Sequence, residues 1–249
     1  MLLKKVADIV QENYQYAAVL HEFGLPFYLY TEKTLAEACQ ARGVNMAYVI
    51  RGLEAIHAPA PTTPVWHECP IELVIHYLRL AHKIFIQEKL PYMARLIADL
   101  KPLPATPKHH VSLMRDLQWL FPMFHEDFTK HIQEEEDTLF RYIATLSQAQ
   151  KGACKLGNLH YQMEKYSIQY FALDHHTHDD EMQGIRELTH NYTLKPQNSL
   201  HLAVIFEELK ALENALIIHA KVEDEILFVK AMCLEQQVKT MLKQKSNWN

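Results

Sequence analysis

The sequence predicts an all-α protein, in which an up-down-up-down four-helix bundle follows a small helical domain. Glycine is scarce, at 6 of 249 residues, and the alternation of apolar and polar residues that marks a β-strand is rare. Beyond residue 70, four long segments instead have helical periodicity, and short loops with proline or glycine separate them. Apolar residues make up 49% of the chain, which is enough to form a core.

Residues 3–56 predict three or four short helices. The second of them ends at Gly24, and the third follows Thr34, a favourable N-cap residue, and ends at Gly43. A proline-rich segment comes next, with three prolines between residues 59 and 64, and this density of proline excludes a helix. We therefore expect a helical N-terminal domain at residues 1–57, a stiff linker at 58–69 and the bundle at 70–249.

Four long helices are expected in the bundle, at about residues 70–100, 109–146, 158–190 and 199–244. Pro122 lies inside the second helix, where it should kink or split it. The connections are short, which favours antiparallel neighbours and an up-down-up-down order. In that order the second and fourth helices run parallel, so similar motifs on them can lie at one level.

The second and fourth helices share the pattern H-x-x-x-E-[ED]-[DE]-x-L-F, which begins at His131 and again at His219. Positions i and i+4 lie on the same face of a helix, about one turn apart. His131 with Glu135, and His219 with Glu223, can therefore each present an imidazole and a carboxylate to one point. The acidic residues beside these two glutamates, within 134–137 and 224–225, are interpreted as solvated faces.

The first and third helices each add one histidine at a matching place. His82 precedes the first motif by 49 residues, and His175 precedes the second by 44. His175 fits the apolar register of its helix, and its neighbours His178 and His176 are the alternatives. Four imidazoles and two carboxylates are therefore expected to converge in the bundle core.

Such a set of groups is costly to bury without a metal. An ionised carboxylate is strongly unfavourable in a core unless it is paired or coordinated, and two facing carboxylates would force one to take a proton. Two divalent cations, bridged by both glutamates, remove this conflict. The cysteines form no C-x-x-C pair, and imidazole and carboxylate ligands without thiolate favour iron or manganese over structural zinc. The sequence therefore predicts two non-haem, carboxylate-bridged iron ions with open positions for oxygen or nitric oxide.

Several motifs together resemble a known protein family. They are His76-x5-His82, His131-x-x-x-Glu135 with Leu139-Phe140, Asp174-His175, residues 185–189 with 191–193, and His219-x-x-x-Glu223 with Leu227-Phe228. These motifs resemble the hemerythrin-like superfamily, and more closely the RIC family of di-iron proteins that repair iron-sulfur centres. The resemblance implies six iron ligands, with terminal histidines and bridging glutamates: His82, His131, Glu135, His175, His219 and Glu223.

The N-terminal region resembles the small helical domain that precedes the bundle in this family. The matching blocks are residues 17–24 and 34–39. The family typically carries a Cys-Cys-Gly-Gly stretch between these blocks, whereas this chain has Tyr28 and Leu29 where the cysteines would be. A role that needs a vicinal thiol pair is therefore not carried over, while the six metal ligands are unaffected.

Three functions are compatible with these features. The first is a cytoplasmic di-iron protein that repairs iron-sulfur clusters under nitrosative or oxidative stress, through iron supply or nitric oxide chemistry, with iron-sulfur proteins as clients. The second is a hemerythrin-like protein that binds or senses oxygen or nitric oxide without iron transfer. The third is a helical interaction protein with a vestigial metal site.

Charge and segment length exclude other classes of protein. The formal charge of −5 leaves no basic footprint for nucleic acid. Lys4, Lys5 and Asp8 interrupt the apolar start, so we expect no signal peptide, and no run approaches the roughly 18 apolar residues of a membrane span. We therefore expect a cytoplasmic protein without a membrane partner, for which a homodimer is allowed.

Overall fold

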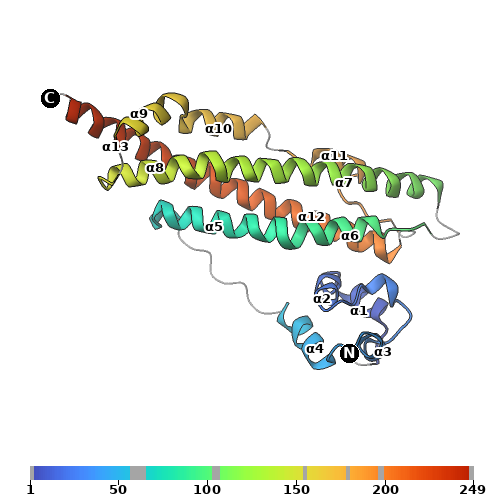
Figure 1. The fold of residues 1–249 in the computed structure, drawn as a ribbon. Helices are drawn as coiled ribbons and strands as arrows, with labels where there is room; N and C mark the ends of the chain where they lie inside the picture. Colours follow the sequence, from blue (N-terminus) through green and yellow to red (C-terminus); the bar gives the residue numbers. More distant parts are fainter. Residues whose placement is uncertain are drawn as a thin grey trace. The chain divides into compact units, whose positions relative to one another are not determined.

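The computed structural model describes residues 3–56, 66–102, 107–153, 156–177, 180–195 and 199–246. Every regular element in these ranges is helical, and only an isolated bridge between Lys5 and Thr34 has strand geometry (Figure 1). The prediction of an all-α helical bundle fold is confirmed. Among the described helices, none combines the length and the apolar character needed to cross a bilayer.

The chain divides into two compact units. Unit 1 consists of Met1–Thr63, Lys89–Pro122 and Gly184–Glu213, and unit 2 consists of Pro64–Glu88, Met123–Gln183 and Asn214–Asn249. The proline-rich part of the expected linker, residues 57–65, lies outside the described residues. The expected boundaries between N-terminal domain, linker and bundle stay a prediction.

The N-terminal part of unit 1 contains four short helices: α1 (Val6–Glu12), α2 (Tyr16–Glu22), α3 (Leu35–Arg42) and α4 (Met46–Ala55). Helix α3 begins at a capping box, in which the side chains of Thr34 and Glu37 each accept a hydrogen bond from the other's backbone N–H. It ends at Gly43, whose φ of +67° is a left-handed conformation that a glycine adopts without strain. The predicted start and stop of this helix are confirmed.

Tyr28 lies where proteins of the similar family have a cysteine, and it makes a polar and an aromatic contact within unit 1. The hydroxyl of Tyr28, on the 3₁₀ turn η1 (Phe27–Leu29), donates to the carboxylate of Asp99 at 2.7 Å. Its ring stacks on that of His201, with 4.5 Å between the ring centroids. Asp99 is the C-cap residue of α6 (Leu90–Ala98), and His201 is the second residue of α12 (Leu200–Val222). Tyr28 therefore has a packing role at this position.

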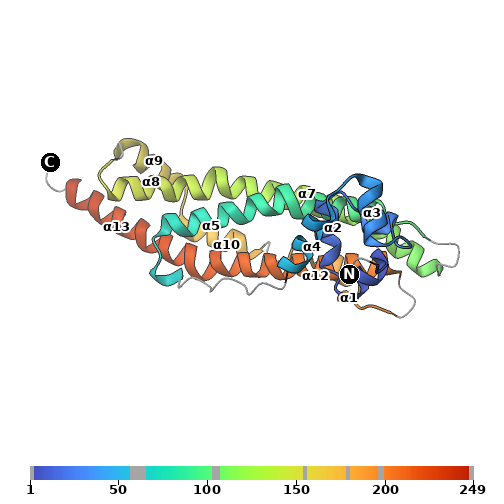
Figure 2. The same cartoon turned by 90° about the horizontal axis from the view of Figure 1, so that it is seen from below.

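Unit 2 contains the helices that carry the predicted metal ligands. They are α5 (Ile71–Ile84), the end of α7 (Lys108–Glu134), α8 (Phe140–Gln150), α9 (Leu156–Lys165), α10 (Ile168–Thr177), the end of α12, and α13 (Phe228–Ser246). Helix α13 packs against α8 and α10 (Figures 1 and 2). Apolar residues of α5, α8 and α13 form part of one buried cluster, in which Leu78, Phe140 and Phe228 have 2% exposure or less.

Three of the four predicted long helices are found, and each is continuous through a π-helical turn. The turns are η3 (Phe85–Lys89) before α6, η4 (Glu135–Leu139) between α7 and α8, and η5 (Glu223–Leu227) between α12 and α13. Turn η3 precedes Pro91, which has no N–H and whose ring would clash with a carbonyl four residues earlier in an α-helix. Pro122 lies within α7 and does not split it.

The prediction of a single third helix over residues 158–190 is wrong. Helix α9 ends at Lys165, α10 spans Ile168–Thr177, and α11 begins only at Gln183 and ends at Leu188. The side chain of Ser167 accepts a hydrogen bond from the backbone N–H of Tyr170, so it caps the start of α10. Serine competes for backbone groups in this way and favours helix ends over helix interiors.

A buried hydrogen bond between α8 and α13 gives a stability prediction. The Tyr142 hydroxyl donates to the Glu235 carboxylate at 2.6 Å, and both side chains are buried. Replacement Tyr142→Phe leaves that carboxylate oxygen without its donor, which should lower the free energy of unfolding by about 1.5–3 kcal/mol. Urea denaturation measures this change. The control Tyr161→Phe removes a hydroxyl from an exposed ring and should change stability little; equal losses in both variants would contradict the prediction.

Candidate metal centre

The two copies of the H-x-x-x-E pattern have the same local structure. In each copy the glutamate is the first residue of a π-helical turn, Glu135 in η4 and Glu223 in η5. The backbone N–H of Phe140 donates to the carbonyl of Glu135, five residues back, and that of Phe228 donates to the carbonyl of Glu223. The sequence repeat is therefore also a structural repeat, and π-helical turns inside α-helices are frequent at functional sites.

All six predicted ligands lie together in unit 2 as two triads, which we call the His131 triad and the His82 triad. The His131 triad is His131, Glu135 and His175; the His82 triad is His82, His219 and Glu223. In each triad one potential ligand atom per residue lies within 4.8 Å of the others. The alternative His178 and the side chain of the alternative His176 lie outside the described residues.

Each glutamate lies between imidazoles of both triads. The two carboxylate oxygens of Glu135 lie 3.3 Å from Nε2 of His82 and 3.3 Å from Nε2 of His131. One oxygen of Glu223 lies 3.2 Å from Nδ1 of His219 and 3.0 Å from Nε2 of His175. Two carboxylates shared in this way have the placement expected of ligands that bridge two cations.

Several polar atoms of the six side chains, within the part of the chain that the structure describes, are buried and have ion contacts at most, without a well-aligned hydrogen bond. They are both carboxylate oxygens of Glu135, Oε1 of Glu223, and Nε2 of His82 and of His219. A buried polar atom left in this state costs about 1–3 kcal/mol. Divalent cations would satisfy these atoms together, so the donor set fits the two metal ions that the sequence predicts.

Comparison with known proteins supports a relationship to iron-centre repair. No protein-family model matches the chain. Curated proteins named iron-sulfur cluster repair protein YtfE are similar to it. Those of Shigella boydii serotype 4 and Escherichia coli K12 are 20% identical over 219 residues, and that of Cronobacter sakazakii is 20% identical over 220 residues. Each match covers 88% of this chain and 92% of the relative.

The predicted resemblance to the iron-sulfur cluster repair proteins is confirmed. The match extends over nearly the full length of these relatives. At this identity the shared name indicates the general class of function, and the chemistry has to be argued from the chain's own residues.

Glu136 and Asp224, which the sequence analysis assigns only to solvated faces, each contact a histidine of one triad in this distant relative of the repair proteins. Glu136 lies 3.0 Å from Nδ1 of His82, and Asp224 lies 3.1 Å from Nδ1 of His175. Each is the residue after a predicted bridging glutamate, and each holds the histidine contributed by a different helix. The signal was present in the pattern, because an acidic residue follows the glutamate in both copies. Carboxylates in this position orient a metal-binding imidazole and raise its basicity.

The charges of the triads shift the pKa values of their own groups. Burial alone would lower the pKa of His131 and of His175, but close contact with Glu135 and Glu223, respectively, outweighs it and raises both to about 9. Burial alone would raise the pKa of Glu135, but contact with His131 and His82 holds it well below its usual range. Without a cation, imidazolium and carboxylate groups therefore neutralise one another.

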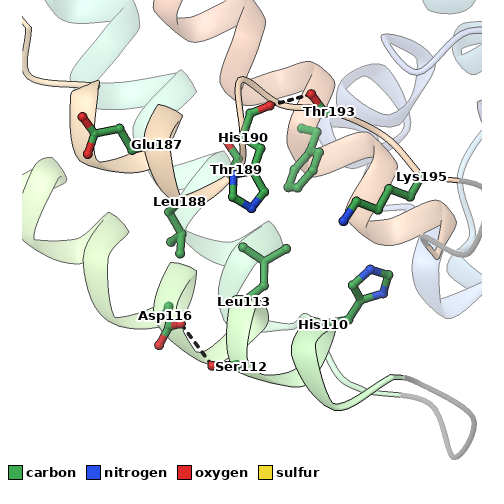
Figure 3. A pocket seen from close by; sticks show the side chains of 11 residues that line it. His110, Ser112, Leu113, Asp116, Glu187, Leu188, Thr189, His190, Thr193 and Lys195 are labelled. Atoms are coloured by element: carbon green, nitrogen blue, oxygen red, sulfur yellow. Dashed lines mark hydrogen bonds between the residues drawn. The ribbon is translucent and has the colours of Figure 1, made fainter.

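A cavity in unit 1 involves none of the six predicted ligands (Figure 3). It has a volume of about 390 Å³, and Lys195, His110 and His190 line it together with Asp116 and Glu187. His190 begins a run of three residues with φ between 51° and 56°, a left-handed conformation that is rare for residues other than glycine. This run belongs to the 185–193 motif, which therefore builds a turn beside this cavity. The lining carries both signs of charge, so it favours neither an anion nor a cation.

Proposed function

We propose that the chain is a di-iron protein that takes part in the repair of iron-sulfur clusters damaged by nitrosative or oxidative stress. The observation that carries this proposal is the pair of triads that share two buried glutamates. The repair role is taken from the name of the similar proteins. In this proposal the glutamates bridge two non-haem iron ions, and the histidines are terminal ligands.

The side chains of the site suit iron better than structural zinc. They offer imidazole and carboxylate groups and no thiolate, and six protein ligands for two ions leave open coordination positions. When bound, ferrous iron would supply those positions for nitric oxide or oxygen, or would itself be the material supplied to a damaged cluster. The described cysteines Cys39, Cys69 and Cys233 are in no disulfide, which suits the reducing cytoplasm that we propose as the place of action.

Aromatic rings of the chain pack against three of the proposed histidine ligands. The ring of Phe140 stacks on His82 with 5.5 Å between centroids, Phe85 lies 5.7 Å from His219, and Phe228 lies 5.5 Å from His175. An apolar surrounding strengthens the interaction between charged ligands and a cation. These rings therefore contribute to metal retention without contributing a ligand.

A second candidate function is binding or sensing of oxygen or nitric oxide without iron transfer. It is favoured by Tyr28, which packs on Asp99 and His201 where the resembled family carries cysteines. The two functions differ in whether iron leaves the protein. A stable gas adduct with no loss of iron in stopped-flow spectra would support sensing.

The repair function is tested with an iron-sulfur dehydratase whose cluster has been damaged by nitric oxide. Iron-loaded protein, added without oxygen, should restore activity of the dehydratase, whereas metal-free protein should not. Iron transfer is followed in parallel with isotopically labelled iron in the protein. Equal recovery of dehydratase activity with iron-loaded and metal-free protein would contradict the proposed repair function.

Removal of the carboxylates that contact the triad histidines, those of Glu136 and Asp224, should weaken metal binding. Replacement of Glu136 or Asp224 by alanine releases Nδ1 of His82 or His175, respectively, and should lower iron affinity about 10–100-fold. Anaerobic competition with a ferrous chelator measures this affinity. The exposed Glu225, next to Asp224 in sequence, provides the control variant Glu225→Ala, which should bind iron normally. Unchanged affinity in the Glu136 and Asp224 variants would show that these carboxylates do not support the ligands.

A further inference from the structure

The two triads differ in their exposure to solvent. His82, His219 and Glu223 are all buried, with His82 at 1% exposure. In the other triad the side chain of His131 is 26% exposed. The sequence repeat gives both triads the same residue types, so this difference arises from what packs around them.

A small cavity opens onto the more exposed triad. It has a volume of about 80 Å³, and all three members of the His131 triad line it, together with Thr138 and Phe171. No member of the His82 triad lines it. A water molecule needs about 10–15 Å³ of such space, so the cavity has room for a diatomic molecule or for the donor atoms of an incoming chelator.

The cavity beside the other triad reaches fewer of its residues. This cavity has a volume of about 380 Å³, but among the three residues of this triad only His82 lines it. Glu136 also lines the cavity, and its carboxylate oxygen lies 3.0 Å from Nδ1 of His82. The opposite nitrogen, Nε2, faces Glu135 and is buried. An iron-accepting molecule in this cavity would therefore reach the Nδ1 side of the His82 ring. It would not reach the Nε2 side, which faces Glu135.

We propose that the two iron positions are inequivalent, with an exchangeable ion at the His131 triad and a retained ion at the His82 triad. This proposal rests on the proposed function and assigns the iron that is delivered to one half of the site. Release is ligand exchange without a change in oxidation state. Bonds from ferrous iron to His131, His175 and the two shared glutamates would break, bonds to the oxygen or nitrogen donors of the acceptor would form, and the freed imidazoles would take up protons.

The test measures iron release from anaerobically loaded protein that carries two ferrous ions per chain. Excess bipyridine is added, and the absorbance of the ferrous complex is followed over time. We expect two phases of equal amplitude, one ion each, with rates that differ at least tenfold. Thr138→Trp should fill the small cavity and slow the fast phase at least tenfold, while the slow phase stays unchanged.

A matched control places the same bulky side chain in the other cavity. Gln87 is exposed and lines the cavity beside His82, so Gln87→Trp should change neither phase. If Thr138→Trp fails to fold, Phe171→Ala provides a second variant. Phe171→Ala widens the small cavity and is expected to speed the fast phase. Two outcomes would overturn the inference. One is a single release phase from protein that carries two ions; the other is a fast phase that is slowed by Gln87→Trp and unchanged by Thr138→Trp. Protein that never binds two ions would instead contradict the proposed function.

Discussion

Replacement of Glu135 by alanine should reduce the iron content from two ions per chain to one or none. Glu135 contacts His82 of one triad and His131 of the other, so its loss removes a ligand from both proposed iron positions. Elemental analysis of protein loaded and desalted without oxygen measures the content. The thermal shift caused by iron should fall as well, because an ion present at about 100-fold its Kd stabilises by about 2.7 kcal/mol. That corresponds to about 5–10 °C in Tm for a chain of this size.

The neighbouring residue gives a close control for this variant. Glu134 is exposed, so Glu134→Ala should retain two iron ions and the full thermal shift. Glu223→Ala, at the same place in the second copy of the motif, should repeat the effect of Glu135→Ala. Two tightly held ions and an unchanged thermal shift in both triad variants would favour the interpretation of a helical interaction protein with a vestigial site.

The stability of the metal-free protein should fall as pH rises from about 6.5 to 9. The pKa values of His131 and His175 are raised in the folded protein to about 9, whereas they are about 6.5 in an unfolded chain. A raised pKa means that the folded state holds the proton more tightly, so this stabilisation is complete below pH 6.5 and lost as pH passes 9. The effect is on the order of 3 kcal/mol for each imidazole. Thermal unfolding of metal-free protein across this pH range measures it.

The same protons should leave when iron binds, because a coordinated imidazole must be neutral. At neutral pH, loading should release the protons of His131 and His175, and any that His82 holds through its own raised pKa, so iron affinity should rise with pH. Titration calorimetry in two buffers of different ionisation enthalpy counts the protons. Binding without proton release, together with a flat stability profile in the metal-free protein, would show that these imidazoles are already neutral at pH 7.

Local rules made much of the architecture predictable. Thr34 and Gly43 mark the ends of a helix because their side-chain and backbone preferences act within a few residues. The i,i+4 spacing of His131 and Glu135 fixes their common face before any partner helix is known. The doubled motif added the information that two such faces exist, and the structure brings both together with His82 and His175. Their role as iron ligands stays a prediction.

Other features depend on contacts between segments that are distant in sequence. Glu136 and Asp224 reach histidines on other helices, so their spacing within their own helices could not separate them from solvated residues. The break at Ser167 is a competition between a side-chain cap and helix continuation, which periodicity does not register. Tyr28 shows the same limit, since its partners Asp99 and His201 lie far along the chain.

The sequence by itself determined the helical class, the two H-x-x-x-E faces and the chemistry of the six donors, because residue type and helical period are local properties. Only the tertiary structure decided which imidazoles share a carboxylate, which are held by a second acid, and why all three residues of one triad line a cavity while His82 alone does so in the other. Those outcomes follow from how neighbouring helices pack and what they bury, and equal motifs can receive unequal surroundings.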